Sequence, residues 1–248
     1  MSFSQFLSRV IVQPARKGKL LQTVAALPTF YAQWRRYTAT SVERVRVDDW
    51  FPCLDDATRT TPFDPHYFYQ SAWVAAHIAR AQPRRHVDVG SQIDLIAPLS
   101  GFVDVEFVDI RPLKASLPRL KSTRGTVLNL PYVNQSIESL SCLHVIEHIG
   151  LGRYGDTLDA DGTRKACREL QRVLASGGIL YVSTPIGRER VEFNAHRIHL
   201  PESIIDYYGG LQLLEFSCVT DEGEFVHNAR LQDCRAFEYG LGLFRFTR

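Results

Sequence analysis

HVDVGS, at residues 86–91, is a short run of strand-forming residues closed by a glycine. A second run, VEFVDI at 105–110, carries Asp109 near its end, 19 residues after Gly90. In an open parallel sheet, ligands bind beyond the carboxyl ends of the strands. There a glycine turn lets the backbone approach the ligand, and an acid about 20 residues later accepts hydrogen bonds from ribose hydroxyls. The two runs therefore predict that Gly90 and Asp109 face one nucleoside-binding crevice.

Further strand and helix patterns alternate along the chain. The other strand-like runs are SLSCLHV (139–145), ILYVST (179–184), LQLLEFSCVT (211–220) and YGLGLFRFT (239–247). Helical patterns cover 66–82 and 163–178, and the second ends in Gly177 and Gly178, which suit a helix stop. Alternating strands and helices predict an α/β, Rossmann-like, doubly wound and mostly parallel sheet over residues 65–248. The last two strands predict a C-terminal antiparallel hairpin, because no clear helix pattern lies between them.

Residues 1–64 are predicted to form a separate N-terminal extension of helix and loop. Leucines from Leu20 to Leu27 show helical spacing, which Pro28 is expected to interrupt. Residues 1–46 contain eight lysines and arginines and one acid, a net charge of +7, whereas the rest of the chain carries −5. Such a basic segment can contact an anionic membrane surface, pack on the main domain, or join two subunits as a homodimer.

Cysteine usage and hydropathy indicate a cytoplasmic protein, with the extension as its only candidate for peripheral membrane contact. The five cysteines are odd in number and widely spaced, and no CxxC motif occurs. This pattern argues against a disulfide framework or a structural zinc site and for a reducing compartment. No apolar run approaches the ~20 residues of a membrane span.

The turn after the first strand favours one class of cofactor. A dinucleotide site has the pattern G-x-G-x-x-G, because a pyrophosphate must lie against a helix N-terminus. Here the turn is GSQIDLIAP (90–98), with a single glycine, and Asp94 would bring negative charge close to a phosphate. S-adenosylmethionine carries no phosphate. It needs one close backbone approach for its amino-acid tail, an acid for its ribose and an apolar slot for its adenine.

The stretches NLPYVNQSIESLSCLHVIEHI (129–149) and ELQRVLASGGILYVSTP (169–185) resemble the central part of class I, type 11 S-adenosylmethionine-dependent methyltransferases. The resemblance covers residues 84–190. The wider set HVDVGS, FVDIRP, HVIEHIGLGRYGD and FNAHRI resembles a bacterial subgroup of methyltransferase-like proteins associated with surface-polysaccharide genes. That context implies a glycan substrate.

The resemblance also implies which residues bind S-adenosylmethionine. They are Asp88, Gly90, Ser91, Asp109, Ile110, Asn129, Leu130 and His144. Asp109 would bind the ribose, Ile110 would lie against the adenine, and His144 would lie beneath the methyl donor. Two departures stand out: Gln92 and Asp94 occur in a turn that usually holds more glycines, and Thr126 stands near the usual place of an acid that contacts the adenine amino group.

Methyl transfer to a hydroxyl calls for a general base, and histidine suits this role near neutral pH. The candidates lie after the fourth and fifth family strands: His148 with Glu147 first, and His196 second. For each histidine the alternative is a hydrogen-bonded loop anchor. The predicted acceptor-binding residues are Arg153, Tyr154, Asp156 and Arg197, with Arg188 and Arg190 as further cations for an anionic acceptor. The alternative for the loop GLGRYGD (150–156) is a tight turn.

HVIEH (144–148) matches the zinc-protease pattern H-x-x-E-H. That chemistry needs both histidines on one face of a continuous helix, whereas this pattern straddles a predicted strand end. The segment DTLDADG (156–162) lacks the ligand alternation and closing glutamate of a calcium loop. We therefore predict no metal site.

These observations predict an S-adenosylmethionine-dependent enzyme that O-methylates a sugar or glycan precursor in surface-polysaccharide biosynthesis. The first alternative is a binding or scaffold protein that keeps the methyltransferase fold without turnover. An RNA methyltransferase is a lesser alternative, motivated by the basic extension. No nucleic-acid-binding module is evident, so no nucleic-acid partner is expected.

Overall fold

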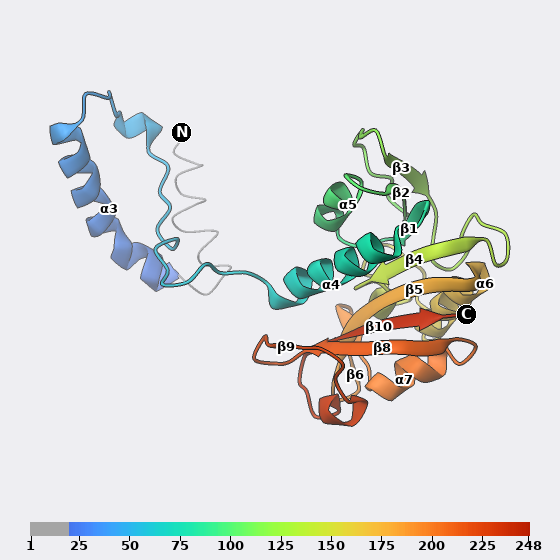
Figure 1. The fold of residues 1–248 in the computed structure, drawn as a ribbon. Coiled ribbons are helices and arrows are strands. Elements are labelled where there is room, and N and C mark those ends of the chain that lie inside the picture. The colour runs from blue at the N-terminus through green and yellow to red at the C-terminus, as the bar shows by residue number, and fades with distance from the viewer. Residues whose placement is uncertain (1–19) are drawn as a thin grey trace. The chain divides into compact units, whose positions relative to one another are not determined.

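The computed structural model describes residues 20–248, and the chain divides into two compact units, Met1–Phe63 and Asp64–Arg248 (Figure 1). The described part of the first unit contains helix α3 (Leu20–Thr40) and the short 3-10 helix η2 (Val47–Asp49), followed by loop. Four of the predicted basic residues, Arg9, Arg16, Lys17 and Lys19, lie outside the described residues.

Aromatic packing ties α3 to the segment that follows it. The Trp50 ring lies 5.3 Å from Phe30 and 5.1 Å from Trp34, centroid to centroid, both edge to face. The predicted interruption at Pro28 is wrong, because α3 runs through this residue. Proline removes one backbone donor without necessarily ending a helix, and the flanking turns here remain helical.

The second unit is built on one eight-stranded sheet in the order β3-β2-β1-β4-β5-β10-β8-β9 (Figure 1). Its strands are β1 (Arg85–Val89), β2 (Asp104–Asp109), β3 (Leu120–Arg124), β4 (Ile137–Leu143), β5 (Leu174–Ile186), β8 (Gln212–Val219), β9 (Phe225–Val226) and β10 (Gly240–Thr247). Strands β1 to β5 pair in parallel, and β10 is antiparallel to both β5 and β8. The short strands β6 (Arg190–Glu192) and β7 (His196–Ile198) form a separate antiparallel hairpin.

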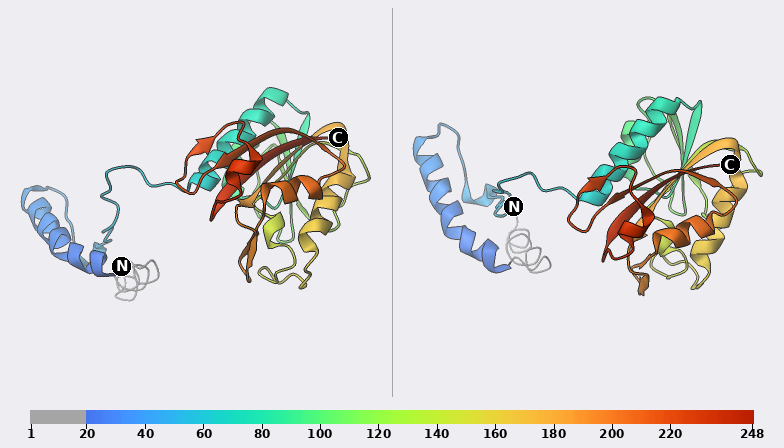
Figure 2. Two further views of the ribbon diagram at one scale, coloured as in Figure 1. Left: turned by 90° about the horizontal axis from the view of Figure 1, so that it is seen from below. Right: turned by 60° about the horizontal axis from the view of Figure 1, so that its bottom comes forward.

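Helices cover both faces of the sheet (Figure 2). They are α4 (Pro65–Ala81), α5 (Ile93–Leu99), α6 (Gly162–Val173) and α7 (Pro201–Tyr207), with the 3-10 helices η3 (Ile146–His148) and η4 (Leu231–Cys234) in the connections. One core packs α4 and α5 on the sheet, with side chains such as Trp73 and Leu243. The other packs α6 and α7 on the opposite face, with Leu170 and Phe244. Leu243 and Phe244 belong to different cores because neighbouring strand residues point to opposite faces.

The predicted fold class is confirmed, including the antiparallel pairing of the two C-terminal strands. One helix boundary is wrong: α6 ends at Val173, and Leu174 already begins β5. Gly177 does adopt a positive φ of 72°, but it lies within β5 rather than at the helix end. Strand β3 was not predicted, because its sequence LKSTR lacks an apolar pattern.

Two further findings concern the whole described part of the chain. In residues 20–248, no helix is both long and apolar enough to span a bilayer. All five cysteines are free thiols, four of them buried.

The packing predicts that removal of one core ring strongly lowers the stability of the protein. Phe244 is fully buried on β10 and lies 4.9 Å from Phe216. We expect Phe244→Ala to lower the free energy of unfolding by about 3–5 kcal/mol, because it removes a buried ring and leaves a cavity. Phe102→Ala is the matched control, since this ring is 45% exposed. Urea denaturation followed by fluorescence compares the two variants, and equal losses would contradict the assigned core.

Candidate active site

The turn after β1 brings the backbone to the edge of the crevice. Gly90 has φ 71°, and its N–H donates to the carbonyl of Val108 at 2.9 Å. A β-carbon at this position would lie 3.4 Å from Val145 and 3.8 Å from the Asp109 carboxylate, in a conformation that residues with side chains rarely adopt. Since β1 and β2 are parallel neighbours, Gly90 and Asp109 end adjacent strands and line the same cavity, as the sequence predicted.

The buried carboxylate of Asp88 stabilises this turn by hydrogen bonds. Asp88 accepts hydrogen bonds from the Ser91 N–H at 3.1 Å and from the Ser141 hydroxyl. The Ser141 hydroxyl also lies 2.8 Å from Nε2 of His86, and the Ser91 hydroxyl accepts from the Leu143 N–H at 3.0 Å. Burial raises the pKa of Asp88 to about 6, although its hydrogen bonds oppose the rise. Asp88 is fully buried, so it shapes the turn without reaching the cavity surface.

Two adjoining cavities open beyond the strand ends. The larger has a volume of about 820 Å³, within the usual range for small-molecule sites. The smaller, of about 130 Å³, is a slot lined by apolar side chains that include Val108, Ile110, Val127, Leu128 and Val145. Gly90, Asp109, Arg111, His144, His148 and Tyr154 line both.

The adenine side of the prediction needs a correction. Ile110 and Thr126 line the slot, as expected from their places in the sequence. Among the described residues, Asn129 and Leu130 line neither cavity. Residues 126–128 of the preceding turn line the slot. Leu130 lies beyond this turn, where it is buried and its N–H donates to Glu169 at 2.7 Å.

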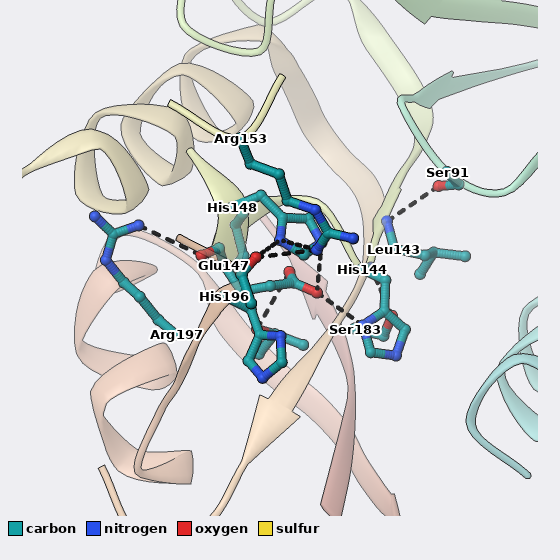
Figure 3. A network of polar contacts seen from close by, with 12 residues as sticks. Ser91, Leu143, His144, Glu147, His148, Arg153, Ser183, His196 and Arg197 are labelled. Carbon is teal, nitrogen blue, oxygen red and sulfur yellow. Dashed lines mark hydrogen bonds and ion pairs between the residues drawn. The ribbon is translucent and has the colours of Figure 1, made fainter. Parts of the chain in front are cut away.

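Glu147 is the centre of a buried polar cluster on η3 (Figure 3). Its carboxylate is fully buried and lies 2.7 Å from Nδ1 of His144 and 3.7 Å from Nε2 of His148. Burial alone would raise the pKa of Glu147. The hydrogen bond from His144 and the charges of both imidazoles outweigh it and lower the pKa below its usual value.

The two histidines that the sequence suggested as general bases, His148 and His196, have different neighbours. His148 Nδ1 lies 2.7 Å from the Ala195 carbonyl and Nε2 faces Glu147, so both ring nitrogens have neighbours. Burial lowers the pKa of His148, although Glu147 acts in the opposite direction. His196 lies on β7, with Nε2 3.1 Å from Glu192. Both line the larger cavity, so the structure brings them to the site together.

The loop 150–156 forms one wall of the cavity. Asp156 accepts from the N–H groups of Gly150 at 2.7 Å and Tyr154 at 3.2 Å, so this carboxylate holds the loop in shape while it lines the slot. The guanidinium groups of Arg111 and Arg153 lie 4.9 and 5.2 Å from the Tyr154 ring centroid. Arg111 pairs with Asp109 at 3.6 Å, whereas within residues 20–248 neither Arg153 nor Lys114 of this cavity wall forms an ion pair.

The predicted acceptor role of Arg197 does not agree with its position. Arg197 is buried, and its guanidinium donates to the carbonyls of Ile149 at 2.7 Å, Glu147 at 3.4 Å and Asp159 at 3.4 Å. Through these hydrogen bonds, the Arg197 guanidinium connects β7 to η3 and to the loop that follows η3. Arg188 and Arg190 form ion pairs with Glu238 and Glu192 and line neither cavity.

The zinc-protease pattern has no helical basis. His144 directly follows β4, whereas His148 closes the three-residue helix η3. A continuous helix that carries both ligands is therefore missing here. Among residues 20–248, no group of three histidine, cysteine or acidic side chains is arranged to hold a metal ion.

Several lining residues were not predicted, namely Tyr67, Arg111, Lys114 and Tyr239. Arg111 lies two residues after Asp109 in the sequence, and this proximity is the one available signal. Tyr67 belongs to the first turn of α4, which Asp64 caps by accepting from the N–H groups of His66 and Tyr67. Tyr239 precedes β10. Only the tertiary fold brings these segments to the cavity.

The pKa of Asp88 predicts a pH-dependent stability. Because folding raises its pKa from 3.8 to about 6, the stabilisation that it provides is present at low pH and is lost as the pH rises through this window. The loss corresponds to up to ~3 kcal/mol. We expect Asp88→Asn to remove this dependence, so that the variant gains stability relative to the wild type between pH 4 and pH 7.5. Asp104→Asn, at a 63% exposed side chain on β2, is the control. Urea denaturation at both pH values measures the difference, and a variant equally destabilised at both would contradict the assignment.

Comparisons with known proteins agree with this architecture. The family described as "Caenorhabditis protein of unknown function, DUF268" matches residues 126–237. No curated protein sequence matches the chain. This family match covers less than half of the chain and includes η3, α6 and the β6–β7 hairpin.

Solved structures resemble the chain over most of its length. A Galdieria sulphuraria protein, provisionally assigned as a sarcosine dimethylglycine methyltransferase, has a TM-score of 0.53 at 14% identity, over 72% of this chain and 85% of that chain. The N-methyltransferase NodS from Bradyrhizobium japonicum WM9, in complex with S-adenosyl-L-homocysteine, has a TM-score of 0.50 at 12% identity, over 78% and 92%. The 4+2 cyclase SpnF has a TM-score of 0.50 at 14% identity, over 71% and 80%. The chain therefore has the fold of class I S-adenosylmethionine-dependent methyltransferases.

Proposed function

We propose that the protein is an S-adenosylmethionine-dependent methyltransferase. The observation that carries this proposal is the meeting of the Gly90 turn and the Asp109 carboxylate at one cavity that continues into an apolar slot. A fold alone does not establish an activity, so the argument depends on this site.

The residues of the site fit the parts of S-adenosylmethionine. Asp109 offers carboxylate oxygens to the ribose hydroxyls, and the slot beside Ile110 and Val127 suits an adenine ring. The backbone at Gly90 can be approached closely because it bears no side chain. When bound, the cofactor supplies a methyl group that is already activated on sulfur. Protein residues then have to orient the acceptor and take its proton.

The rest of the larger cavity suits an anionic acceptor. Arg111 and Arg153 lie against the Tyr154 ring, Lys114 lines the same cavity, and Asp109 is the single acid on the lining among the described residues. Guanidinium and ammonium groups recognise phosphate and carboxylate. With the resemblance to proteins linked to surface polysaccharides, this lining favours O-methylation of a phosphorylated or nucleotide-linked sugar, or of a glycan precursor.

The N-terminal unit suits a peripheral role at an anionic membrane surface of the cytoplasm. Arg35 and Arg36 lie on α3, between Tyr31 and Tyr37 in the sequence, and both tyrosines are about half exposed. Basic and aromatic side chains together favour the interface of anionic lipid. Homodimer formation through the same unit is the alternative partner.

A non-catalytic binding protein is the second candidate function, and the single glycine of the turn favours it. Gln92 and Ile93 occupy the positions after Ser91 and line the larger cavity. Their side chains narrow the space for the amino-acid part of the cofactor. Cofactor affinity alone does not separate the two candidates, whereas turnover does.

Titration calorimetry with S-adenosyl-L-homocysteine tests the cofactor site. We expect Asp109→Ala to raise the Kd by about 10- to 100-fold, because a charged hydrogen-bond acceptor is lost. Asp104→Ala, at the other end of the same strand, is the matched control and should leave the Kd unchanged. An unchanged Kd in Asp109→Ala, or no heat for the wild type at high micromolar ligand, would overturn the cofactor assignment.

Transfer of a labelled methyl group to fractionated cell glycans tests the acceptor. We expect label in an anionic glycan or sugar-phosphate fraction, and loss of that label with Asp109→Ala. Label in RNA would support the nucleic-acid alternative, and binding of S-adenosyl-L-homocysteine without transfer to any fraction would support the non-catalytic protein.

A further inference from the structure

We infer that His144 takes the proton from the acceptor hydroxyl through its Nε2 atom, and that Glu147 is the residue that positions it. This inference rests on the proposed methyltransferase function. It assigns the role of general base to His144, which the sequence analysis grouped with the cofactor-binding residues. His148, the first candidate from the sequence, then has a supporting role beside Glu147.

The hydrogen bond to Glu147 fixes the tautomer of His144. Nδ1 of His144 lies 2.7 Å from Oε1 of Glu147, whose carboxylate is fully buried (Figure 3). An ionised carboxylate only accepts hydrogen bonds, so Nδ1 carries the hydrogen. In the neutral ring Nε2 then has the lone pair. A carboxylate in this position also stabilises the imidazolium that forms when Nε2 takes a proton.

Nε2 of His144 has no hydrogen-bond partner among the described residues, although its side chain is only 7% exposed. A buried acceptor without a partner is energetically unfavourable, because it has lost its hydrogen bonds to water. His144 also lines both the larger cavity and the apolar slot, at the junction of the proposed acceptor and cofactor parts. A ligand hydroxyl that donates to Nε2 would satisfy this atom where methyl transfer takes place.

The backbone holds His144 in an uncommon conformation. Its φ is 55°, which residues with a side chain seldom adopt. Its N–H donates to Ser183, at 3.0 Å to the carbonyl and 3.1 Å to the hydroxyl. The Ser183 hydroxyl in turn donates to Gln70 of α4. These bonds fix the ring at the end of β4, and strain of this kind concentrates at functional sites.

Other titratable groups around His144 are less suited to this role. From α4, His66 stacks on the ring at 5.7 Å and Tyr67 lies at 5.1 Å, whereas Glu147 and His148 face it from η3. Burial, with the charge of His144, lowers the pKa of His66 to about 4, so it is a weak base. Tyr239 stacks on His66 and not on His144. His148 has its Nδ1 at the Ala195 carbonyl and its Nε2 3.7 Å from Glu147, and burial lowers its pKa, which makes it the weaker base.

The methyl-transfer step balances with three participants: the acceptor hydroxyl, the methyl donor and His144. The acceptor oxygen forms a bond to the methyl carbon while the carbon–sulfur bond breaks, and that bond's electron pair stays on sulfur. The hydroxyl proton passes to Nε2 of His144, and the imidazolium later releases it to water. A base is required because an alcohol, like an amine or a thiol and unlike a carboxylate, loses a proton during methylation. The unpartnered Nε2 therefore fits an acceptor that carries such a proton, and the sugar hydroxyl of the proposed function is one.

Methyl transfer to the glycan fraction that takes up label, measured against pH, tests this inference. For the wild type we expect a rate that rises with pH through one ionisation. His144→Ala and His144→Gln should lose about 10²- to 10⁴-fold in rate and lose that ionisation. Added imidazole should partly restore His144→Ala. Glu147→Gln should lower the rate less and shift the ionisation to lower pH. His227→Ala, at a 58% exposed side chain, is the control that keeps the wild-type rate.

Two measurements separate failure of this inference from failure of the proposed function. If the wild type binds no S-adenosyl-L-homocysteine, the proposed function fails. If it binds and transfers methyl groups, but the folded His144 variants keep the rate and pH profile, the inference alone is overturned. NMR of ¹⁵N-histidine-labelled protein with S-adenosyl-L-homocysteine needs no acceptor. We expect His144 with its proton on Nδ1, and a proton on Nε2 of the neutral ring would also overturn the inference.

Discussion

The parallel pairing of β1 with β2 on one side and with β4 on the other is the constraint on which the site depends. Because the three strands run the same way, their carboxyl ends meet at one edge, and Gly90, Asp109 and His144 lie there. Side chains of α4, α5, α6 and α7 cover the sheet on both faces, which removes its interior from water. The edge itself stays open, so the polar groups that the strand ends deliver can bind a ligand.

The pKa values of two buried carboxylates at this edge are shifted in opposite directions from their usual values. Asp88 receives hydrogen bonds from neutral donors, a hydroxyl and a backbone N–H, and burial prevails and raises its pKa. Glu147 faces two imidazoles, whose positive forms outweigh burial and lower its pKa. The first carboxylate shapes the turn beneath the proposed cofactor, and the second orients a histidine beside the proposed acceptor. Such opposite environments are typical of sites where carboxylates have separate roles.

The sequence predicts those parts of the molecule that depend on local pattern. Apolar strand runs gave β1, β2, β4, β5, β8 and β10, but the polar run of β3 carries no such signal. Gly90 and Asp109 were predictable because each ends a strand whose direction follows from the alternation. The burial of Arg197 and the turn that leads Leu130 away from the slot depend on side-chain directions that tertiary contacts decide. The contact of Tyr67 with His144 joins segments far apart in the chain, and no spacing rule predicts it.

The fold leaves the chemistry open, since a 4+2 cyclase and an N-methyltransferase both share it with this chain at 14% and 12% identity. The strand ends of β1 and β2 form the proposed cofactor side, whereas η3, the first turn of α4 and the segment before β10 form the other side. The second group lies in connections and helix ends, which change without disturbing the sheet. The proposed reaction therefore depends on which hydrogen-bonding atom these connections present beside the proposed cofactor. In this chain the atom that we infer for this role is Nε2 of His144, whose other ring nitrogen is held by Glu147.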